Sequence, residues 1–213
     1  MYQWLKIHQN MRTGLVMSFE GDNEIAGWAF IYDQSLAVQA FVKFSDFDRA
    51  RKNLRFFSRD AKTGGGLYYN AYYVNDGSPA EYTIHCGPNI WLGIAALQYT
   101  VKTGDKEYLD MAERIANAVM DIQSEDKDGG IRGGPTVNWF STEHNLDAYA
   151  YFVMLHKITG NPKYIRAAEK TLSWLIQHTY DRQELPVKRG KGDSTIATDT
   201  YAWSIAAIGP ATL

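Results

Sequence analysis

Two kinds of apolar segment alternate along the chain. Residues 90–97 and 201–208 are apolar almost all round, which is typical of helices that are buried on every side. Residues 105–123 and 162–178 place their apolar positions on one face and charges on the other, as surface helices do. The pattern therefore predicts pairs of helices in which a buried helix is followed by an exposed one.

A repeat of about 56 residues relates these pairs, with Tyr108 and Tyr164 at equivalent positions. Thr-Gly-Asp at 103–105 and Thr-Gly-Asn at 159–161 join the two helices of each pair. A glycine with positive φ can end one helix, and the Asp or Asn after it can cap the next. Two helices joined by so short a turn pack antiparallel.

The predicted elements fill the chain in order. We expect helices at 2–10, 32–43, 46–60, 89–102, 105–123, 142–159, 162–178 and 199–208, with loops between them. Buried helices that alternate with surface helices favour an all-α fold, an α/α toroid with the buried helices as its inner wall. We expect a single domain over 1–213, with about 3.5 to 4 hairpins of an (α/α)6-like barrel. A superhelical solenoid is the structural alternative, but it would leave both helices of a pair with a solvent-exposed face.

The same geometry predicts where a site would lie. All inner helices run the same way, so their N-termini and the long loops before them meet at one face. Asp33, Asn89, Asn145 and Asp199 are interpreted as equivalent positions on that face.

Composition excludes several function classes. The net charge is −2 and no basic run reaches five residues, so a nucleic-acid partner is not expected. A single cysteine, Cys86, allows no internal disulfide and no cysteine zinc cluster, so we predict neither metal nor cofactor. The chain has no stretch of eighteen apolar residues, so we expect no membrane span. The first ten residues do not resemble a signal peptide. By default we expect a cytoplasmic protein.

Five motifs carry a resemblance to a known superfamily: Tyr32-Asp-Gln-Ser-Leu-Ala37, Gly87-Pro-Asn-Ile-Trp-Leu92, Gly130-Ile-Arg-Gly-Gly134, Ser141-Thr-Glu-His-Asn-Leu-Asp-Ala148 and Ala197-Thr-Asp-Thr-Tyr-Ala-Trp203. Together with the hairpin pattern, the chain resembles the six-hairpin glycosidases, (α/α)6 toroids that include unsaturated glucuronyl hydrolases, endoglucanases and sugar epimerases. The resemblance implies a carbohydrate ligand, an oligosaccharide, and a glycoside hydrolase-like activity. Six hairpins would need roughly 330 residues, so we expect a C-terminal portion of a longer chain, or a homo-oligomer, to complete the barrel.

Glycoside cleavage needs two carboxyl groups, one protonated and one ionised. We predict Glu143 as the acid, because neighbouring aromatic residues would disfavour its charged form. Asp33 or Asp199 would be the second carboxylate. Each has an alternative role at a helix N-terminus: Asp33 and Asp199 as caps, and Glu143 as an ordinary residue of the first turn.

Further side chains on the expected face are candidates for binding the sugar. They are His144, Asn145, Asn89, Arg132, Trp139, Tyr72 and Trp28. Aromatic rings can stack on sugar faces, but they serve equally well in a core. Arg132 and the basic run 188–191 could hold a uronate or phosphate, or remain solvated loop charges. Two alternative functions remain: a non-catalytic helical-repeat binding module, and an epimerase or isomerase that uses His144 or His85.

Overall fold

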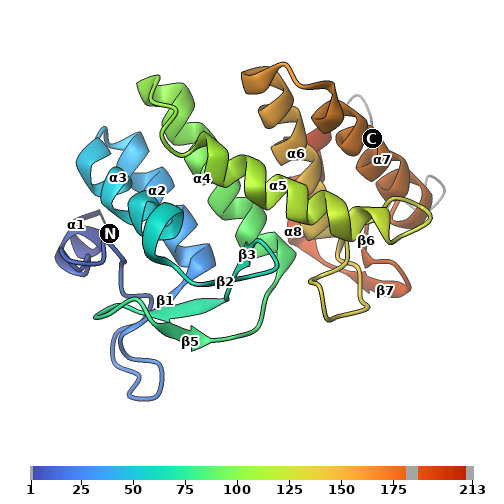
Figure 1. Ribbon diagram of the computed structural model, residues 1–213. Coiled ribbons are helices and arrows are strands. Elements are labelled where there is room, and N and C mark those ends of the chain that lie inside the picture. Colours follow the sequence, from blue (N-terminus) through green and yellow to red (C-terminus); the bar gives the residue numbers. More distant parts are fainter. Residues whose placement is uncertain (1, 181–186, 210–213) are drawn as a thin grey trace. The chain divides into compact units, whose positions relative to one another are not determined.

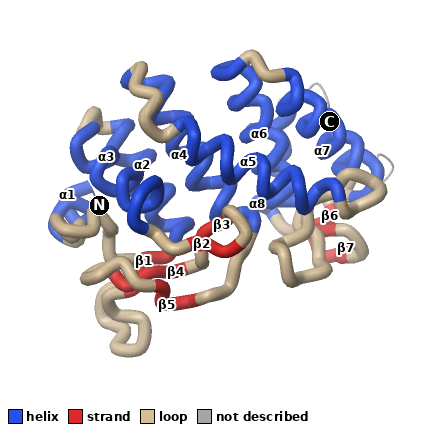
Figure 2. Tube along the Cα trace, in the orientation of Figure 1, coloured by secondary structure: helices blue, strands red, loops and turns tan. Residues whose placement is uncertain are grey.

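The computed structural model describes residues 2–180 and 187–209, and it is mostly helical (Figures 1 and 2). Residues Met1–Ile115 and Ala116–Leu213 form two compact units. Helix α5 (Leu109–Ser124) passes from the first unit into the second. Among the described residues, no helix combines the length and the apolar composition that crossing a membrane requires.

The first unit is built on two neighbouring helices, α2 (Ile31–Lys43) and α4 (Cys86–Thr103). Helix α3 (Phe47–Arg55) packs against α2 and continues into a π-helical turn, η1 (Phe56–Asp60). The short α1 (Tyr2–Ile7) precedes them. Both α2 and α4 are buried along most of their length, as their all-round apolar composition predicts.

The long loops of the first unit hold small antiparallel sheets where the sequence pattern predicts only loops. Strands β1 (Trp28–Phe30), β4 (Ala71–Tyr73) and β5 (Pro79–Glu81) form one sheet in that order, with Trp28 opposite Tyr73. Strands β2 (Thr63–Gly64) and β3 (Leu67–Tyr68) form a second. These strands are two or three residues long, too short to show a period-2 pattern.

The second unit centres on α6 (Thr142–Thr159), which packs against α7 (Pro162–His178) and α8 (Thr198–Ile208) (Figure 1). Leu146, Trp174 and Leu175 form a buried cluster between these helices. A hairpin of β6 (Lys188–Gly190) and β7 (Asp193–Ile196) lies beside α6, where the sequence pattern predicts a loop. The predicted bounds of 142–159 and 162–178 are confirmed.

Both glycine ends of the predicted turns and the Asn161 cap are confirmed, but the predicted helix start at 105 is wrong, because α5 begins at Leu109. Gly104 and Gly160 follow α4 and α6 with φ of 77° and 71°, and each N–H bonds to a carbonyl four residues earlier, at 2.8 Å. The Asn161 side chain accepts from the N–H of Lys163 at 3.1 Å and so caps α7. Positive φ is readily reached only by residues without a Cβ, so glycine fits both positions.

Three buried amides fasten a preceding loop to an inner helix. Asn145 accepts from Ile131 N–H at 2.8 Å and donates to the carbonyls of Ile131 and Ser141 at 3.0 and 2.8 Å. Asn89 makes the same contacts with Tyr68 and with the His85 carbonyl.

In α2 this role belongs to Gln34, whose amide accepts from and donates to the Val16 backbone, both at 2.7 Å. Asn89 and Asn145 therefore correspond to Gln34, and the predicted equivalence with Asp33 is wrong by one residue. The same offset makes His144 the counterpart of Asp33.

Removing the Asn145 amide should destabilise the second unit. Asn145→Ala leaves the buried N–H and C=O of Ile131 without partners, which should lower the free energy of unfolding by about 3 kcal/mol. Urea denaturation at constant protein concentration measures the change. Asn117→Ala is the control: Asn117 is exposed and only accepts from Lys163, so a loss under about 0.5 kcal/mol is expected.

Candidate functional site

A cavity of about 580 Å³ opens in the second unit at the N-terminal end of α6. The loop before α6 contributes Trp139 and Phe140, and the first turn of α6 contributes Glu143 and His144. The β6–β7 hairpin contributes Arg189, Lys191, Asp193 and Thr195, and the first turn of α8 contributes Asp199. Glu143 and Asp199, two of the predicted catalytic residues, therefore line one cavity.

Local sequence explains why α6 begins at this cavity. The hydroxyl of Ser141 accepts from the His144 N–H at 3.3 Å and caps the helix. Ser141 also pairs with Gly190 in an isolated β-bridge, and the Thr142 hydroxyl donates to the Lys188 carbonyl. These contacts fasten the first turn of α6 to the beginning of the hairpin, so Glu143 and Arg189 come to the same cavity.

Burial is the main cause that raises the pKa of Glu143, and the negative charge of Asp199 raises it further. The positive charge of Arg189 acts in the opposite direction. Asp199 accepts a hydrogen bond from the Thr200 N–H at 2.8 Å. Glu143 thus keeps its proton to higher pH than an exposed glutamate, as a general acid must.

Trp139 gives the cavity an exposed aromatic wall. Its side chain is 46% exposed, and its ring centroid lies 5.4 Å from that of His144. Gly133 lies directly against the indole, since a Cβ at Gly133 would come within 2.1 Å of it. The Gly133 N–H also donates to the Trp139 carbonyl at 2.9 Å. Trp139 is therefore held by its own loop, partly exposed at the cavity.

The hairpin brings Arg189 and Lys191 of the predicted basic run 188–191 to the cavity and adds Asp193 and Thr195, which the sequence reasoning missed. Asp193 accepts hydrogen bonds from the Thr195 side chain and backbone, which lower its pKa, so it is an ionised acceptor at the cavity. The sequence held one signal for this hairpin: Gly192, with φ of 78°, precedes Asp193 as the turn residue between two polar strands. Among the described residues, no group of three or more His, Cys, Asp or Glu could hold a metal ion.

The sequence matches glycosyl hydrolase family 76 over residues 6–208. The chain belongs to glycosyl hydrolase family 76. This assigns it to the six-hairpin glycosidases, as its motifs predicted. No curated protein sequence matches the chain significantly.

Solved structures share the fold of this family 76 chain. A D-mannose isomerase superposes with a TM-score of 0.77 at 16% identity, over 96% of this chain and 61% of its own. A family 76 mannosidase from Bacteroides thetaiotaomicron gives 0.75 at 13% identity, over 97% and 62%. The unsaturated glucuronyl hydrolase of Bacillus sp. GL1 gives 0.74 at 16%, over 98% and 67%.

These neighbours confirm the α/α-toroid fold class. The chain spans about three fifths of the length of the D-mannose isomerase and the mannosidase. At such low identity the similarity concerns the fold and not the chemistry.

The structure places Asp33, Trp28 and Tyr72, three of the predicted site residues, in the first unit. They are not among the residues that line the cavity. Burial raises the pKa of Asp33, and it outweighs a hydrogen bond with Ser18 that acts to lower the pKa. Trp28 is partly buried and packs edge-on against Tyr73, with ring centroids 6.2 Å apart. Tyr72 is fully buried: its hydroxyl donates to the Lys62 carbonyl at 2.6 Å, so its ring offers no face for stacking. The expected stacking role of Tyr72 is therefore replaced by a core role.

Three further predicted binding residues have partners within the protein. Asn89 and Asn145 are fully buried and their amides are engaged by backbone groups, so the structure gives them a structural role instead of a ligand contact. Arg132 forms an ion pair with Glu125 in its own loop and does not line the cavity. Of the predicted binding residues in the second unit, His144 and Trp139 are the two that reach the cavity.

Proposed function

We propose that this chain cleaves a glycosidic bond with Glu143 as general acid and Asp199 as the second carboxylate. The observation that carries the proposal is the presence of both carboxyl groups at one cavity, with burial and the Asp199 charge raising the pKa of Glu143. Two carboxyl groups with unlike environments are the arrangement that glycoside cleavage requires.

The proposed chemistry assigns one task to each group. Glu143 donates its proton to the glycosidic oxygen as the bond to the anomeric carbon breaks, so the leaving sugar departs as a neutral alcohol. Asp199, ionised, either takes a proton from the attacking water or attacks the anomeric carbon itself. Arg189 and Asp193 are placed to bind sugar hydroxyl groups at the cavity wall.

We infer a mannose-containing oligosaccharide as the substrate class. The support is that the family 76 neighbour is a mannosidase and that a second neighbour is a D-mannose isomerase. Incubation with a panel of α- and β-linked manno-, gluco- and galacto-oligosaccharides, with products separated by chromatography, tests the class. Release of shorter manno-oligosaccharides supports it, and cleavage confined to another sugar would contradict it.

Replacing Trp139 should weaken substrate binding more than it slows the chemical step. Trp139→Ala removes the exposed ring face at the cavity, so we expect KM to rise about tenfold, equivalent to roughly 1.4 kcal/mol, with kcat within a factor of about three. Initial rates over a range of oligosaccharide concentrations separate the two constants. Tyr82→Ala, which removes an exposed ring of the first unit, should leave KM unchanged. A fall in kcat alone would assign Trp139 to the chemistry instead.

A sugar isomerase or epimerase is the second candidate, favoured by one observation. His144 lies next to Glu143 at the cavity, where an imidazole and a carboxyl group could act as an acid/base pair on an open-chain sugar. Incubation with free mannose and detection of a ketose or an epimer would support this function. Hydrolysis of oligosaccharides without conversion of the free sugar would exclude it.

A further inference from the structure

The β6–β7 hairpin supplies four cavity residues but has few backbone contacts at its tip. Its ladder pairs Lys188 with Ile196 and Gly190 with Asp193, with an irregularity between them. The Ser141–Gly190 bridge and the Thr142 hydroxyl bond fasten β6 to α6. Lys191 and Gly192 then form the turn. Something besides the ladder is needed to hold this turn in one position.

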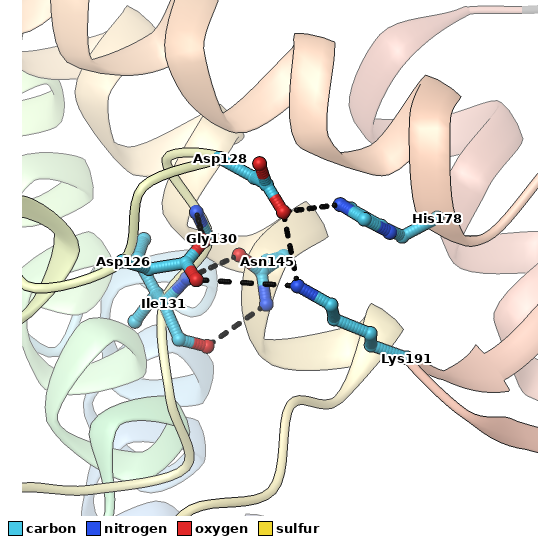
Figure 3. A network of polar contacts seen from close by, with 7 residues as sticks. All are labelled: Asp126, Asp128, Gly130, Ile131, Asn145, His178 and Lys191. Atoms are coloured by element: carbon cyan, nitrogen blue, oxygen red, sulfur yellow. Dashed lines mark hydrogen bonds and ion pairs between the residues drawn. The ribbon is translucent and has the colours of Figure 1, made fainter.

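The Lys191 side chain provides that contact (Figure 3). Its ammonium lies 3.1 Å from Asp128 Oδ2 and 4.0 Å from Asp126 Oδ1, on the loop before α6. His178, the last residue of α7, approaches the same Asp128 oxygen with Nε2 at 3.1 Å. The carboxylate side chains of Asp126 and Asp128 are only 12% and 19% exposed. Ion pairs that are partly withdrawn from water are screened less than exposed ones, so these contacts can hold the turn in place.

The acceptor side of this contact is itself rigidly held. Asp126 Oδ2 accepts from the Gly130 N–H at 2.8 Å, which closes the loop on itself. Gly130 lies against the buried Trp174 indole, where a Cβ would come within 2.2 Å. The next residue, Ile131, is fastened to α6 by Asn145 (Figure 3). The loop is thus fixed to the helix that carries Glu143.

Lys191 also lies over an aromatic surface. Its ammonium is 5.4 Å from the centroid of Phe140, and Phe140 stacks on Trp174 at 5.6 Å. A cation over a ring face gains further attraction. The two aspartates and the ring together engage the ammonium, and Lys191 is also one of the residues that line the cavity.

We propose that Lys191 is a positioning residue whose ion pair with Asp128 anchors the tip of the β6–β7 hairpin, and thereby places Asp193 and Arg189 at the sugar-binding cavity. The effect on catalysis rests on the proposed glycosidase function. The anchoring itself does not, so the two ideas can fail separately.

Hydrogen exchange measured by mass spectrometry tests the anchor without any substrate. In Lys191→Met and in Asp128→Asn, amides of 188–196 should exchange at least about tenfold faster, while those of 147–155 in α6 stay unchanged. The double variant should exchange no faster than the faster single variant, because the Lys191–Asp128 contact is lost in both. Lys191→Arg keeps a cation within reach of both aspartates, so its amides at 188–196 should exchange as slowly as those of the wild type. Lys188→Met, which removes a charge on the same strand, is the matched control and should leave exchange as it is.

Steady-state kinetics then tests the link to the cavity. We expect Lys191→Met and Asp128→Asn each to lower kcat/KM for the oligosaccharide by about ten- to a hundredfold, mostly through KM, with the double variant no worse than the worse single one. The proposed anchoring role of Lys191 would be overturned by unchanged amide exchange in Lys191→Met. It would also be overturned if the losses of kcat/KM in the two single variants added up in the double variant. Faster exchange with unchanged kcat/KM would overturn the positioning role. If the unmodified chain cleaves no glycoside, the proposed function fails, and the exchange experiment alone decides the anchor.

Discussion

Glu143→Gln should lower kcat by about 10³-fold on a natural oligosaccharide, because it removes the proton that assists departure of the leaving sugar. Initial-rate measurements at the pH optimum give the size of the loss. A glycoside whose leaving group is a nitrophenolate needs little protonation, so its cleavage by the same variant should fall far less. That dependence on the leaving group separates a missing acid from a disturbed cavity. Equal losses on both substrates would remove Glu143 from the acid role.

The same substitution should leave the protein more stable at neutral pH. In the folded chain burial and Asp199 raise the pKa of Glu143, so the folded state binds its proton to higher pH than the unfolded state does. The stability of the wild type therefore falls, relative to the Glu143→Gln variant, as pH rises from the ordinary glutamate pKa through the raised one. Below that window Glu143 is neutral in both states and the advantage of the variant disappears. Urea titrations at acidic and neutral pH measure this difference, and Glu169→Gln on the exposed face of α7 should show none.

The helical part of the fold could be predicted because it depends on periodicity and on turn chemistry. Residues 142–159 and 162–178 are bounded by a serine cap, a left-handed glycine and an asparagine cap, each with a direct physical cause. The strands could not be predicted in the same way. In the β6–β7 hairpin no apolar alternation exists, and the strands form because polar side chains and α6 hold them. Tertiary contacts of this kind leave little trace in local composition.

The lining of the cavity was predicted in part, and for identifiable reasons. Glu143, His144 and Trp139 could be found because a capped helix start places its first turn and its preceding loop together. Asn145 and Asn89 were misread, because a polar residue near a helix start looks the same in sequence whether its amide meets a ligand or a neighbouring backbone. Arg189 belongs to the basic run 188–191, which the sequence did offer, whereas Asp193 depends on a strand pairing that only the folded chain reveals.

Asp199→Asn should lower kcat by about 10³-fold as well, since it removes the charge that would activate water or attack the anomeric carbon. It should also alter the pH dependence of the remaining rate. The negative charge of Asp199 raises the pKa of Glu143, so removing that charge lets Glu143 ionise at lower pH. The alkaline limb of the rate–pH profile should therefore move to lower pH. A rate–pH profile of the variant measures this shift.

The matched control is Asp110→Asn, which neutralises an exposed carboxylate in the first turn of α5. It should change neither the rate nor the profile. A loss of rate in Asp199→Asn with an unmoved alkaline limb would mean that the group titrating there is not Glu143. A moved limb with nearly full rate would keep Asp199 as the electrostatic neighbour of the acid. The second catalytic role would then pass to another carboxylate at the cavity, for which Asp193 is the candidate.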